Sequence, residues 1–266
     1  MTIPARSLKK VPAVLARCFL LSLAALFTLI EMSNAQLSSG SCGEYRGTLG
    51  GMPIGLSLYS NGTDFTGSYF YFRYLADIPL TGSYSAPRDI TLVEKQADGT
   101  PQGTFKLRFA EHDPRYPASE PLQAEILKGT WTDPDGKKSL PVSIEMQTNC
   151  PKPGDRWYRI AGSASDQTVE QNAGAFYHAV LSGNRGEAAK YVSFPCTYFL
   201  NGKRLSLKNS AAFLEQYDHI FSPAFVGKIA KDVPHHMFSN WQGIMIADGA
   251  VWFDEHGKAK HLNNPE

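Results

Sequence analysis

Residues 89–109 read DITLVEKQADGTPQGTFKLRF and carry the clearest fold signal in the chain. The first residues alternate between two faces, with Ile90, Leu92 and Glu94 on one and Thr91, Val93 and Lys95 on the other. A period of two is the period of a pleated strand. Asp98-Gly99 follows, and this pair supplies the positive φ of a tight hairpin turn. The stretch therefore predicts a β-hairpin whose second strand is GTFKLRF.

The same pattern extends over residues 42–150. Runs of strand character, separated by turn signals at short intervals, are PIGLSLYS, DFTGSYFYFRY, IPLTGSYS, DITLVEK, GTFKLRF, AEILKGTWT and SLPVSIEM. The connections leave no room for crossover helices, so sequential hairpins are the simplest path. We therefore expect residues 42–150 to form an antiparallel β-meander domain that curls into a barrel or a sandwich.

A short motif recurs within these runs: a glycine, a hydroxyl residue and a large apolar residue. It begins at Gly47, Gly67, Gly82, Gly103 and Gly129. A glycine inside a strand marks a bend, a bulge or a close approach of backbones. The motif predicts a curved sheet with large side chains filling its inner face.

Residues 160–266 change character. Helical spacing begins near Asp166, which is expected to cap a helix, and Asn209 is expected to cap another. Pro223 suits the first turn of a third helix. The strand-like segments GIMIA, AVWFD and KAKHLN follow. Helices before a terminal antiparallel sheet predict an α+β cone, in which helices cover one face of a curved sheet.

Several sequence words resemble those of known families. FTGSY and GTWTDPDGK resemble strand motifs of avidin-like barrels, which implies a barrel but no ligand, because only Trp131 is present where that family has several tryptophans. NGKRLSLKN, FLEQYDHIF and QGIMIADGAVWF resemble the C-terminal region of exported proteins with an NTF2-like domain. Together with GSYFY, ITLVEK and GTW, they resemble a family of uncharacterised exported bacterial proteins. That resemblance implies location rather than chemistry.

The first 35 residues have the order of a secretory signal peptide. A basic segment precedes the apolar run FLLSLAALFTLI, and Ser33 and Ala35 occupy the −3 and −1 positions of a cleavage site before Gln36. An uncleaved anchor is the alternative. The remainder has 22 basic and 24 acidic residues, a formal charge of −2. This charge gives no electrostatic footprint for nucleic acid, and export predicts a periplasmic or secreted protein.

Three cysteines follow the signal segment. Cys42 precedes the first strand-like run and Cys150 follows the last, so a disulfide between them would close the ends of the β-domain, as export permits. Cys196 is expected to be a buried small hydrophobic residue. A reactive thiol there would need an electropositive, open setting.

Candidate site residues fall into two groups. Tyr217, Asp218 and His236 are candidate acid–base groups of an NTF2-like enzyme, with Asp218 as a buried general base; the alternative places Asp218 in a salt bridge. Candidate ligand-binding residues are Tyr69, Tyr71, Trp241 and Trp252. No metal site is predicted, since adjacent residues of an extended loop, such as His235 and His236, point to opposite sides.

These observations favour a periplasmic, non-catalytic binding protein without a cofactor. Its partner would be an envelope protein or a small ligand, as for an inhibitor or an immunity-type protein. An NTF2-like isomerase or hydrolase with an acid–base pair in the C-terminal cone is the alternative, and a structural envelope component is a third class. The aromatic run from Phe65 to Tyr74 is either an exposed binding platform or a strand covered on both faces.

Overall fold

A computed structural model describes residues 37–264, except residues 87, 97, 111–125 and 201. The predicted signal peptide lies outside these residues, as does the proline-containing segment EHDPRYPASEP at 111–121. None of the described helices has the length and apolarity needed to cross a membrane. Residues Ala35–Glu266 make up one compact unit, in which the buried hydrophobic side chains fall into two separate clusters.

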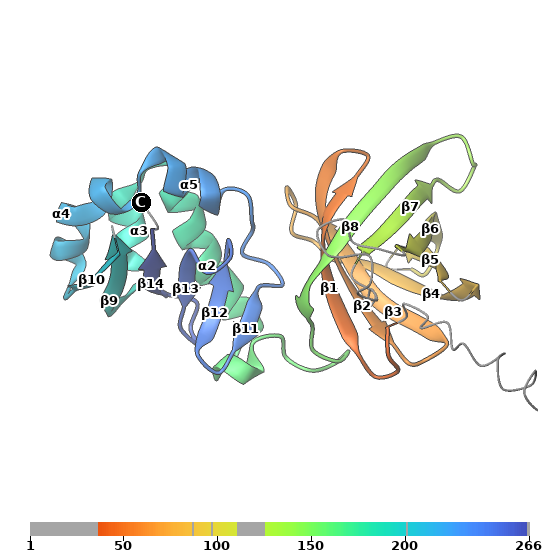
Figure 1. Ribbon diagram of the computed structural model, residues 1–266, viewed down its shortest axis with the longest axis horizontal. Helices are drawn as coiled ribbons and strands as arrows, with labels where there is room; N and C mark the ends of the chain where they lie inside the picture. Colours follow the sequence, from red (N-terminus) through yellow and green to blue (C-terminus); the bar gives the residue numbers. More distant parts are fainter. Residues whose placement is uncertain (1–36, 87, 97, 111–125, 201, 265–266) are drawn as a thin grey trace, which may run out of the picture. The chain divides into compact units, whose positions relative to one another are not determined.

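The first cluster fills a closed barrel of eight antiparallel strands (Figure 1). The strands are β1 (Cys42–Leu49), β2 (Met52–Ser60), β3 (Asp64–Tyr71), β4 (Ile78–Ala86), β5 (Asp89–Lys95), β6 (Pro101–Phe109), β7 (Ile126–Thr132) and β8 (Ser139–Asn149). Each strand pairs with the next, and β8 returns to pair with β1. The predicted antiparallel meander is confirmed, and the barrel rather than the sandwich is its form.

The inner face of the barrel is filled by side chains at alternate positions. Ile90 and Leu92 of β5 point inward, as do Phe105 and Leu107 of β6, and all four are at most 2% exposed. Phe65 and Tyr69 of β3 join the same cluster. The alternation that predicts the hairpin at residues 89–109 therefore also identifies its core residues.

The recurring glycines lie where strands approach closely. A Cβ built on Gly47, Gly67, Gly82 or Gly129 would stand 1.9–2.1 Å from a carbonyl oxygen of the neighbouring strand. At Gly103 the nearest atom is the indole nitrogen of Trp131, at 2.2 Å. Real Cβ atoms do not come within 3.0 Å of such atoms. The close approach expected from the motif is confirmed.

We expect the Gly67→Ala variant to lower the free energy of unfolding by about 1–3 kcal/mol, because its methyl group would overlap the carbonyl oxygen of Ser57 and force backbone shifts. Urea denaturation measures the loss. Gly227→Ala is the control, since no atom lies within 4 Å of its added Cβ and alanine favours a helix. Equal stability of the two variants would contradict the proposed role of the glycine.

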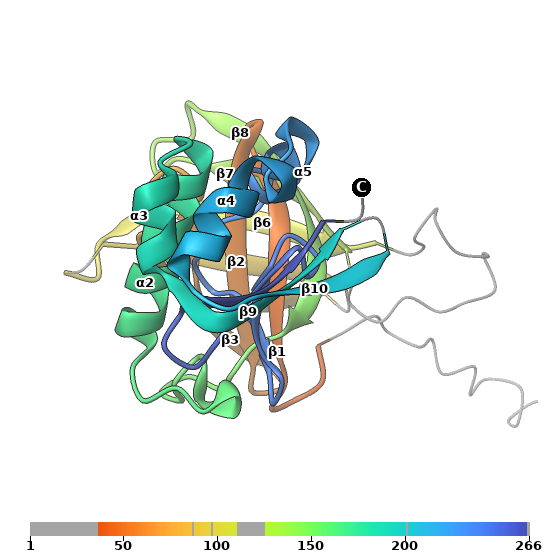
Figure 2. The same ribbon diagram turned by 90° about the vertical axis from the view of Figure 1, so that its left-hand side faces the viewer.

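The second cluster lies in an α+β region that begins with a short turn, η1 (Arg159–Ala161). Its helices are α2 (Asp166–Leu181), α3 (Arg185–Lys190), α4 (Ser210–Ile220) and α5 (Pro223–Ile229). Its strands are β9 (Val192–Leu200), β10 (Lys203–Leu207), β11 (Phe238–Asn240), β12 (Gly243–Ile246), β13 (Val251–Phe253) and β14 (Ala259–Asn263). The sheet order is β10-β9-β14-β13-β12-β11, and Figure 2 shows β9 and β10 beside α4.

This sheet differs from the expected antiparallel one at a single pairing. β14 pairs with β9 in parallel, whereas the other pairs are antiparallel. Parallel pairing needs a long connection, and the chain between β9 and β14 contains two helices and four strands. Alternation along each strand identified faces but could not specify this partner.

The helix starts agree with the sequence in two of three places. Asn209 accepts a hydrogen bond from the Ala212 N–H, and Pro223 opens α5. The expected cap at Asp166 is wrong, since Ser165 caps α2 by accepting from the Thr168 N–H. Asp166 begins the helix, and its carboxylate accepts the backbone N–H groups of Trp157 and Tyr158 instead.

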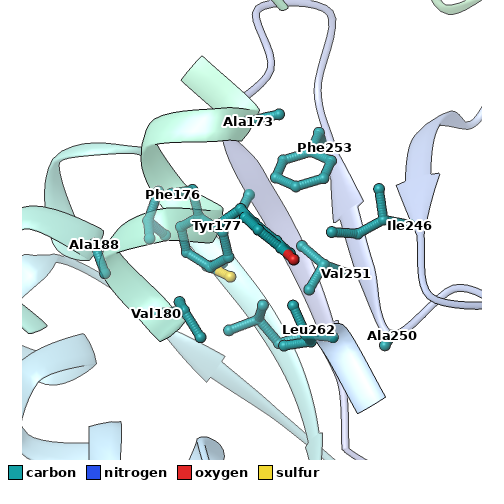
Figure 3. Close-up of a cluster of buried hydrophobic side chains, with 14 of the residues drawn as sticks. Ala173, Phe176, Tyr177, Val180, Ala188, Ile246, Ala250, Val251, Phe253 and Leu262 are labelled. Atoms are coloured by element: carbon teal, nitrogen blue, oxygen red, sulfur yellow. The ribbon is translucent and has the colours of Figure 1, made fainter. Parts of the chain in front are cut away.

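The core of the α+β region lies between α2 and the inner face of the sheet (Figure 3). Phe176 of α2 contacts Phe253 of β13 edge to face, with ring centroids 5.9 Å apart. Cys196 lies in the same cluster and is fully buried. Burial raises the pKa of its thiol to about 12, so the expected inert cysteine is confirmed and the reactive alternative is not.

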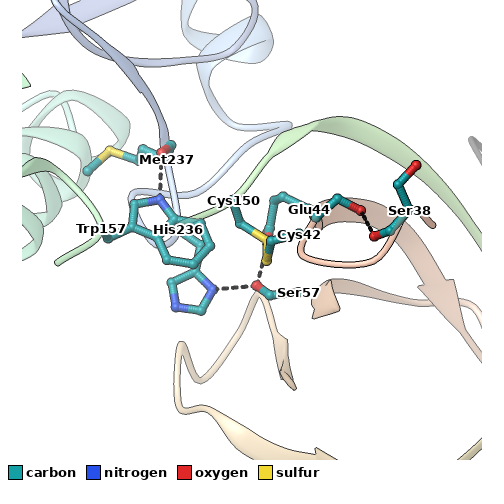
Figure 4. The surroundings of a disulfide bond; sticks show 9 residues. Ser38, Cys42, Glu44, Ser57, Cys150, Trp157, His236 and Met237 are labelled. Carbon is teal, nitrogen blue, oxygen red and sulfur yellow. Dashed lines mark hydrogen bonds between the residues drawn. A yellow bond between two sulfur atoms is a disulfide. The ribbon is translucent and has the colours of Figure 1, made fainter. Parts of the chain in front are cut away.

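Cys42 and Cys150 lie at disulfide distance, with Cα atoms 4.9 Å apart, and the structure joins them (Figure 4). The Cys150 N–H also donates to the Cys42 carbonyl, at 3.0 Å, as the chain leaves β8. The predicted pairing is confirmed, and it links the first strand of the barrel to the last.

Candidate functional site

The structure does not bring the candidate acid–base residues together. Asp218 is solvent-exposed, with 73% of its side chain accessible, and forms a salt bridge with Arg185 at 3.1 Å. Tyr217 is buried against Phe213 and Phe221 on the inner face of α4. Neighbouring helical positions diverge by about 100°, so Asp218 lies outside the interior in which a general base was expected.

The four candidate ligand-binding residues are also dispersed. Tyr69 is buried inside the filled barrel, and Tyr71 is half-buried with its ring 5.7 Å from the Tyr69 ring. Trp241 is 79% exposed at the turn between β11 and β12, whereas Trp252 of β13 is half-buried in a shallow cleft with Phe199. These aromatics do not form a shared pocket among the described residues.

His235 and His236 are brought together by an unusual backbone conformation. His236 has φ of +48°, in the left-handed region that costs a non-glycine residue free energy. The two imidazole rings consequently stack on the same side of the chain, with centroids 4.2 Å apart and planes 17° apart. The expectation that the two side chains point in opposite directions is wrong, because the loop is not extended at His236.

Each nitrogen of His235 has a carboxylate partner. Its Nδ1 lies 2.8 Å from Oε2 of Glu170 on α2, and its Nε2 lies 3.2 Å from Oδ1 of Asp77, which precedes β4. Burial disfavours the charged imidazole, but Asp77 and Glu170 outweigh that effect and raise the pKa of His235 to about 9. Burial likewise opposes ionisation of Asp77 and Glu170, yet hydrogen bonds from the histidines hold both pKa values below their ordinary range.

His236 has an equally complete environment. Its Nε2 lies 3.3 Å from the second Asp77 oxygen, and its Nδ1 lies 3.2 Å from the Ser57 hydroxyl (Figure 4). Its ring stacks on Trp157, with centroids 3.9 Å apart and planes 8° apart. The Trp157 indole N–H donates to the Met237 carbonyl at 2.8 Å, which holds the stacking partner in position.

The barrel supports this cluster through a buried ion pair. Arg46 Nη1 lies 2.8 Å from Oε1 of Glu44, which is 1% exposed, and the Ser57 hydroxyl donates to the other Glu44 oxygen. Burial raises the pKa of Glu44, although Arg46 opposes that shift. Arg46 Nη2 also donates to the carbonyls of His235 and His236, at 2.8 and 2.9 Å. These two bonds fasten the left-handed turn to β1.

Phe70 covers the cluster on its apolar side. Its ring meets the His235 and His236 rings edge to face, with centroids 4.5 and 5.3 Å away, and Arg46 lies 5.0 Å from its centroid. Strand β3 is thus covered on both faces at Tyr69 and Phe70. This agrees with the second alternative for the aromatic run, a covered strand, and not with an exposed binding platform. Tyr74, beyond the strand, is exposed.

A cleft of about 510 Å³ opens beside His236. Its lining combines charged groups with apolar side chains, among them Arg46, Lys228, Lys231, Phe72, Met237 and Met245. Three of the four described non-glycine residues with positive φ line it: His236, Ala247 and Asp248. Residues held in this region of φ cluster at functional sites, so the cleft is the best-marked binding location among the described residues.

Sequence reasoning identified His236 but missed its partners. Asp77, Glu170, Glu44, Arg46 and Ser57 are scattered over more than a hundred residues and belong to no short motif. The one local signal is Pro234-His235-His236, in which two titratable residues follow a proline. Their pairing with the barrel depends on tertiary contacts that no spacing encodes.

No protein-family model matches this chain, and neither a curated protein nor a solved structure matches it. The resemblance to avidin-like barrels and NTF2-like domains therefore rests only on the short sequence segments quoted above and on the order of the elements.

Proposed function

We propose that this chain is an exported, non-catalytic binding protein whose ligand is a small amphipathic anion held in the cleft beside His236. The observation that carries the proposal is the cleft itself. Its volume of about 510 Å³ falls within the range of small-molecule sites, roughly 300–1,000 Å³.

The charges of the cleft favour an anionic group on the ligand. Glu44 is already paired with Arg46, and Asp232 accepts the backbone N–H groups of Val233 and Ala247. Lys228, Lys231 and Asp248 form no ion pair with any residue that the structure describes. The formal charges of the described lining balance, with three cationic and three anionic side chains. Lys228 and Lys231 are the two cations left without a carboxylate partner, so an anionic ligand group would meet their ammonium groups.

The apolar lining favours a hydrophobic body attached to that anion. Phe72, Met237, Phe238 and Met245 line the cleft, and methionine side chains adapt to irregular ligand shapes. A ligand with an aromatic or aliphatic part next to a carboxylate, sulfonate or phosphate satisfies both halves of the lining.

The disulfide and the order of the elements support the export and the fold assignment that belong to this proposal. A Cys42–Cys150 bridge persists in an oxidising compartment, which supports export to the periplasm. Two helix pairs that alternate with the strands of one six-stranded sheet support an NTF2-like assignment for the α+β region, a fold that hosts binding modules as well as enzymes. The exposure of Asp218 gives no support to the isomerase or hydrolase alternative in the form that uses Asp218 as a buried base.

The test uses 8-anilinonaphthalene-1-sulfonate, an amphipathic anion, in buffer containing a metal chelator. We expect saturable binding to the mature protein. Gln147→Trp places a large side chain at the cleft lining and should weaken binding at least about tenfold, since 1.4 kcal/mol corresponds to that factor. Replacing Lys228 and Lys231 together by glutamine should have a similar effect, because hydrogen bonds to charged groups contribute about 1.5–3 kcal/mol.

Ser143→Trp is the matched control, since Ser143 is an exposed residue of the same strand, β8, outside the cleft. Its dissociation constant should equal that of the unmodified protein. Equal affinity in the Gln147→Trp and Ser143→Trp proteins would place the probe elsewhere and overturn the proposal.

A further inference from the structure

We propose that Asp77, His235 and His236 form a binding site for a zinc ion. The three side chains present two imidazole Nε2 atoms and a carboxylate, all within 4.8 Å of one another. Two histidines and one carboxylate, with a further position open, are the ligand set of several catalytic zinc sites. The inference concerns a metal rather than the amphipathic ligand and does not depend on the proposed function.

The spacing between the histidine nitrogens and the Asp77 oxygens is close to that of ligands around a zinc ion. Atoms placed tetrahedrally at about 2.0–2.1 Å from the ion stand roughly 3.3–3.4 Å apart. His235 Nε2 lies 3.2 Å from Asp77 Oδ1, His236 Nε2 lies 3.3 Å from Asp77 Oδ2, and one ligand atom from each of the three residues lies within 4.8 Å of the others. Charge-assisted hydrogen bonds are shorter, about 2.7–2.9 Å, and the Glu170–His235 contact at 2.8 Å is one of these.

The hydrogen-bond partners of the two Nδ1 atoms orient both imidazole rings so that each Nε2 faces Asp77. Histidine ligands of metals usually donate the other ring N–H to a carboxylate, a carbonyl or a water. His235 Nδ1 faces Glu170, and His236 Nδ1 faces the Ser57 hydroxyl, which in turn donates to Glu44. This arrangement places N–H on both Nδ1 atoms and aims both Nε2 lone pairs at Asp77.

A zinc ion would take the place of the protons that the histidines share with Asp77. Ligating histidines must be neutral, so zinc binding at this site would release protons. An ion seated there meets two nitrogens and one or both Asp77 oxygens. Asp77 is partly exposed, with 43% of its side chain accessible, so the ion has a route from solvent.

The backbone holds the ligands in place before any ion arrives. The left-handed φ of His236 turns two consecutive rings to one side, and Arg46 fixes both carbonyls of that turn. Trp157 and Phe70 pack against the rings. Because the ligands are already held in place, zinc binding would cost little conformational entropy. This saving would offset the free-energy cost of the left-handed φ at His236.

The experiment is a calorimetric titration of zinc sulfate into the mature, untagged protein after removal of metals with a chelator. We expect one zinc ion per chain. Glu170→Gln should weaken zinc binding by about 10–100-fold, the usual effect of altering a residue that is hydrogen-bonded to a metal ligand. Asp77→Asn, which replaces a ligand itself, should weaken it further. Cobalt(II) should give the intense visible absorption of tetrahedral coordination.

His178→Ala is the matched control, because His178 is an exposed histidine of α2 and is not one of the three zinc ligands. It should bind zinc as tightly as the unmodified protein. Asp77 is exposed and precedes β4, and circular dichroism of Asp77→Asn confirms that the variant is folded. Absence of zinc binding by the unmodified protein, or undiminished binding by Asp77→Asn, would overturn the proposal.

Discussion

The Arg46→Met variant should lose about 3–5 kcal/mol of unfolding free energy, as expected when one partner of a buried ion pair is removed. Glu44 would remain buried without its counter-charge. The change also removes two hydrogen bonds to the carbonyls of His235 and His236. Urea denaturation, monitored by tryptophan fluorescence in the presence of a chelator, measures the loss as a shift in midpoint.

Two comparisons isolate the cause. Adding Glu44→Gln to the Arg46→Met protein should recover part of the loss, because the neutral amide no longer requires a positive partner. Arg185→Met is the control for an exposed pair, since Arg185 and Asp218 are both solvent-accessible, and it should cost about 1 kcal/mol or less. A similar loss in the Arg46 and Arg185 variants would show that burial of Glu44 is not the source.

Replacing Cys42 and Cys150 by alanine should lower the free energy of unfolding by about 2–5 kcal/mol. The bridge spans 108 residues of sequence, and the chain-entropy model assigns about 4.7 kcal/mol to a loop of roughly that length. Without the bridge, the unfolded chain gains freedom that the native barrel lacks. The measurement is the urea midpoint of the oxidised protein against that of the variant.

Reduction supplies the control for this prediction. Dithiothreitol should shift the midpoint of the unmodified protein toward that of the variant and leave the variant unchanged, because Cys196 forms no bridge. Thiol titration of the unfolded chain verifies that reduction is complete. If complete reduction left the urea midpoint of the unmodified protein unchanged, the result would contradict the stabilising role of the disulfide.

The barrel was predictable because its signals are local. Alternation at residues 89–109 identified a hairpin, and Asp98-Gly99 identified its turn. The glycine motif anticipated close contacts between strands, and the positions of Cys42 and Cys150 anticipated their bridge. Each of these inferences needs only the chain within a few residues, or the two ends of one repeated pattern.

The α+β region was predictable only in outline. Helical spacing identified α2 and α4, but the parallel partner of β14 depends on a contact between Leu262 and Tyr198, more than sixty residues apart. The prediction that His235 and His236 point to opposite sides was wrong for a related reason. It holds for an extended loop, whereas His236 has a left-handed φ at a turn to which Arg46 and Glu170, from other elements, are hydrogen-bonded.

The place of β14 in the sheet has a consequence for the order of folding. β14 lies between β9 and β13, so before residues Ala259–Asn263 arrive the sheet exists only as two disconnected pieces, β10-β9 and β13-β12-β11. The two pieces can join only after residues Ala259–Asn263 have been made, so closing of this sheet follows the synthesis of all its other strands.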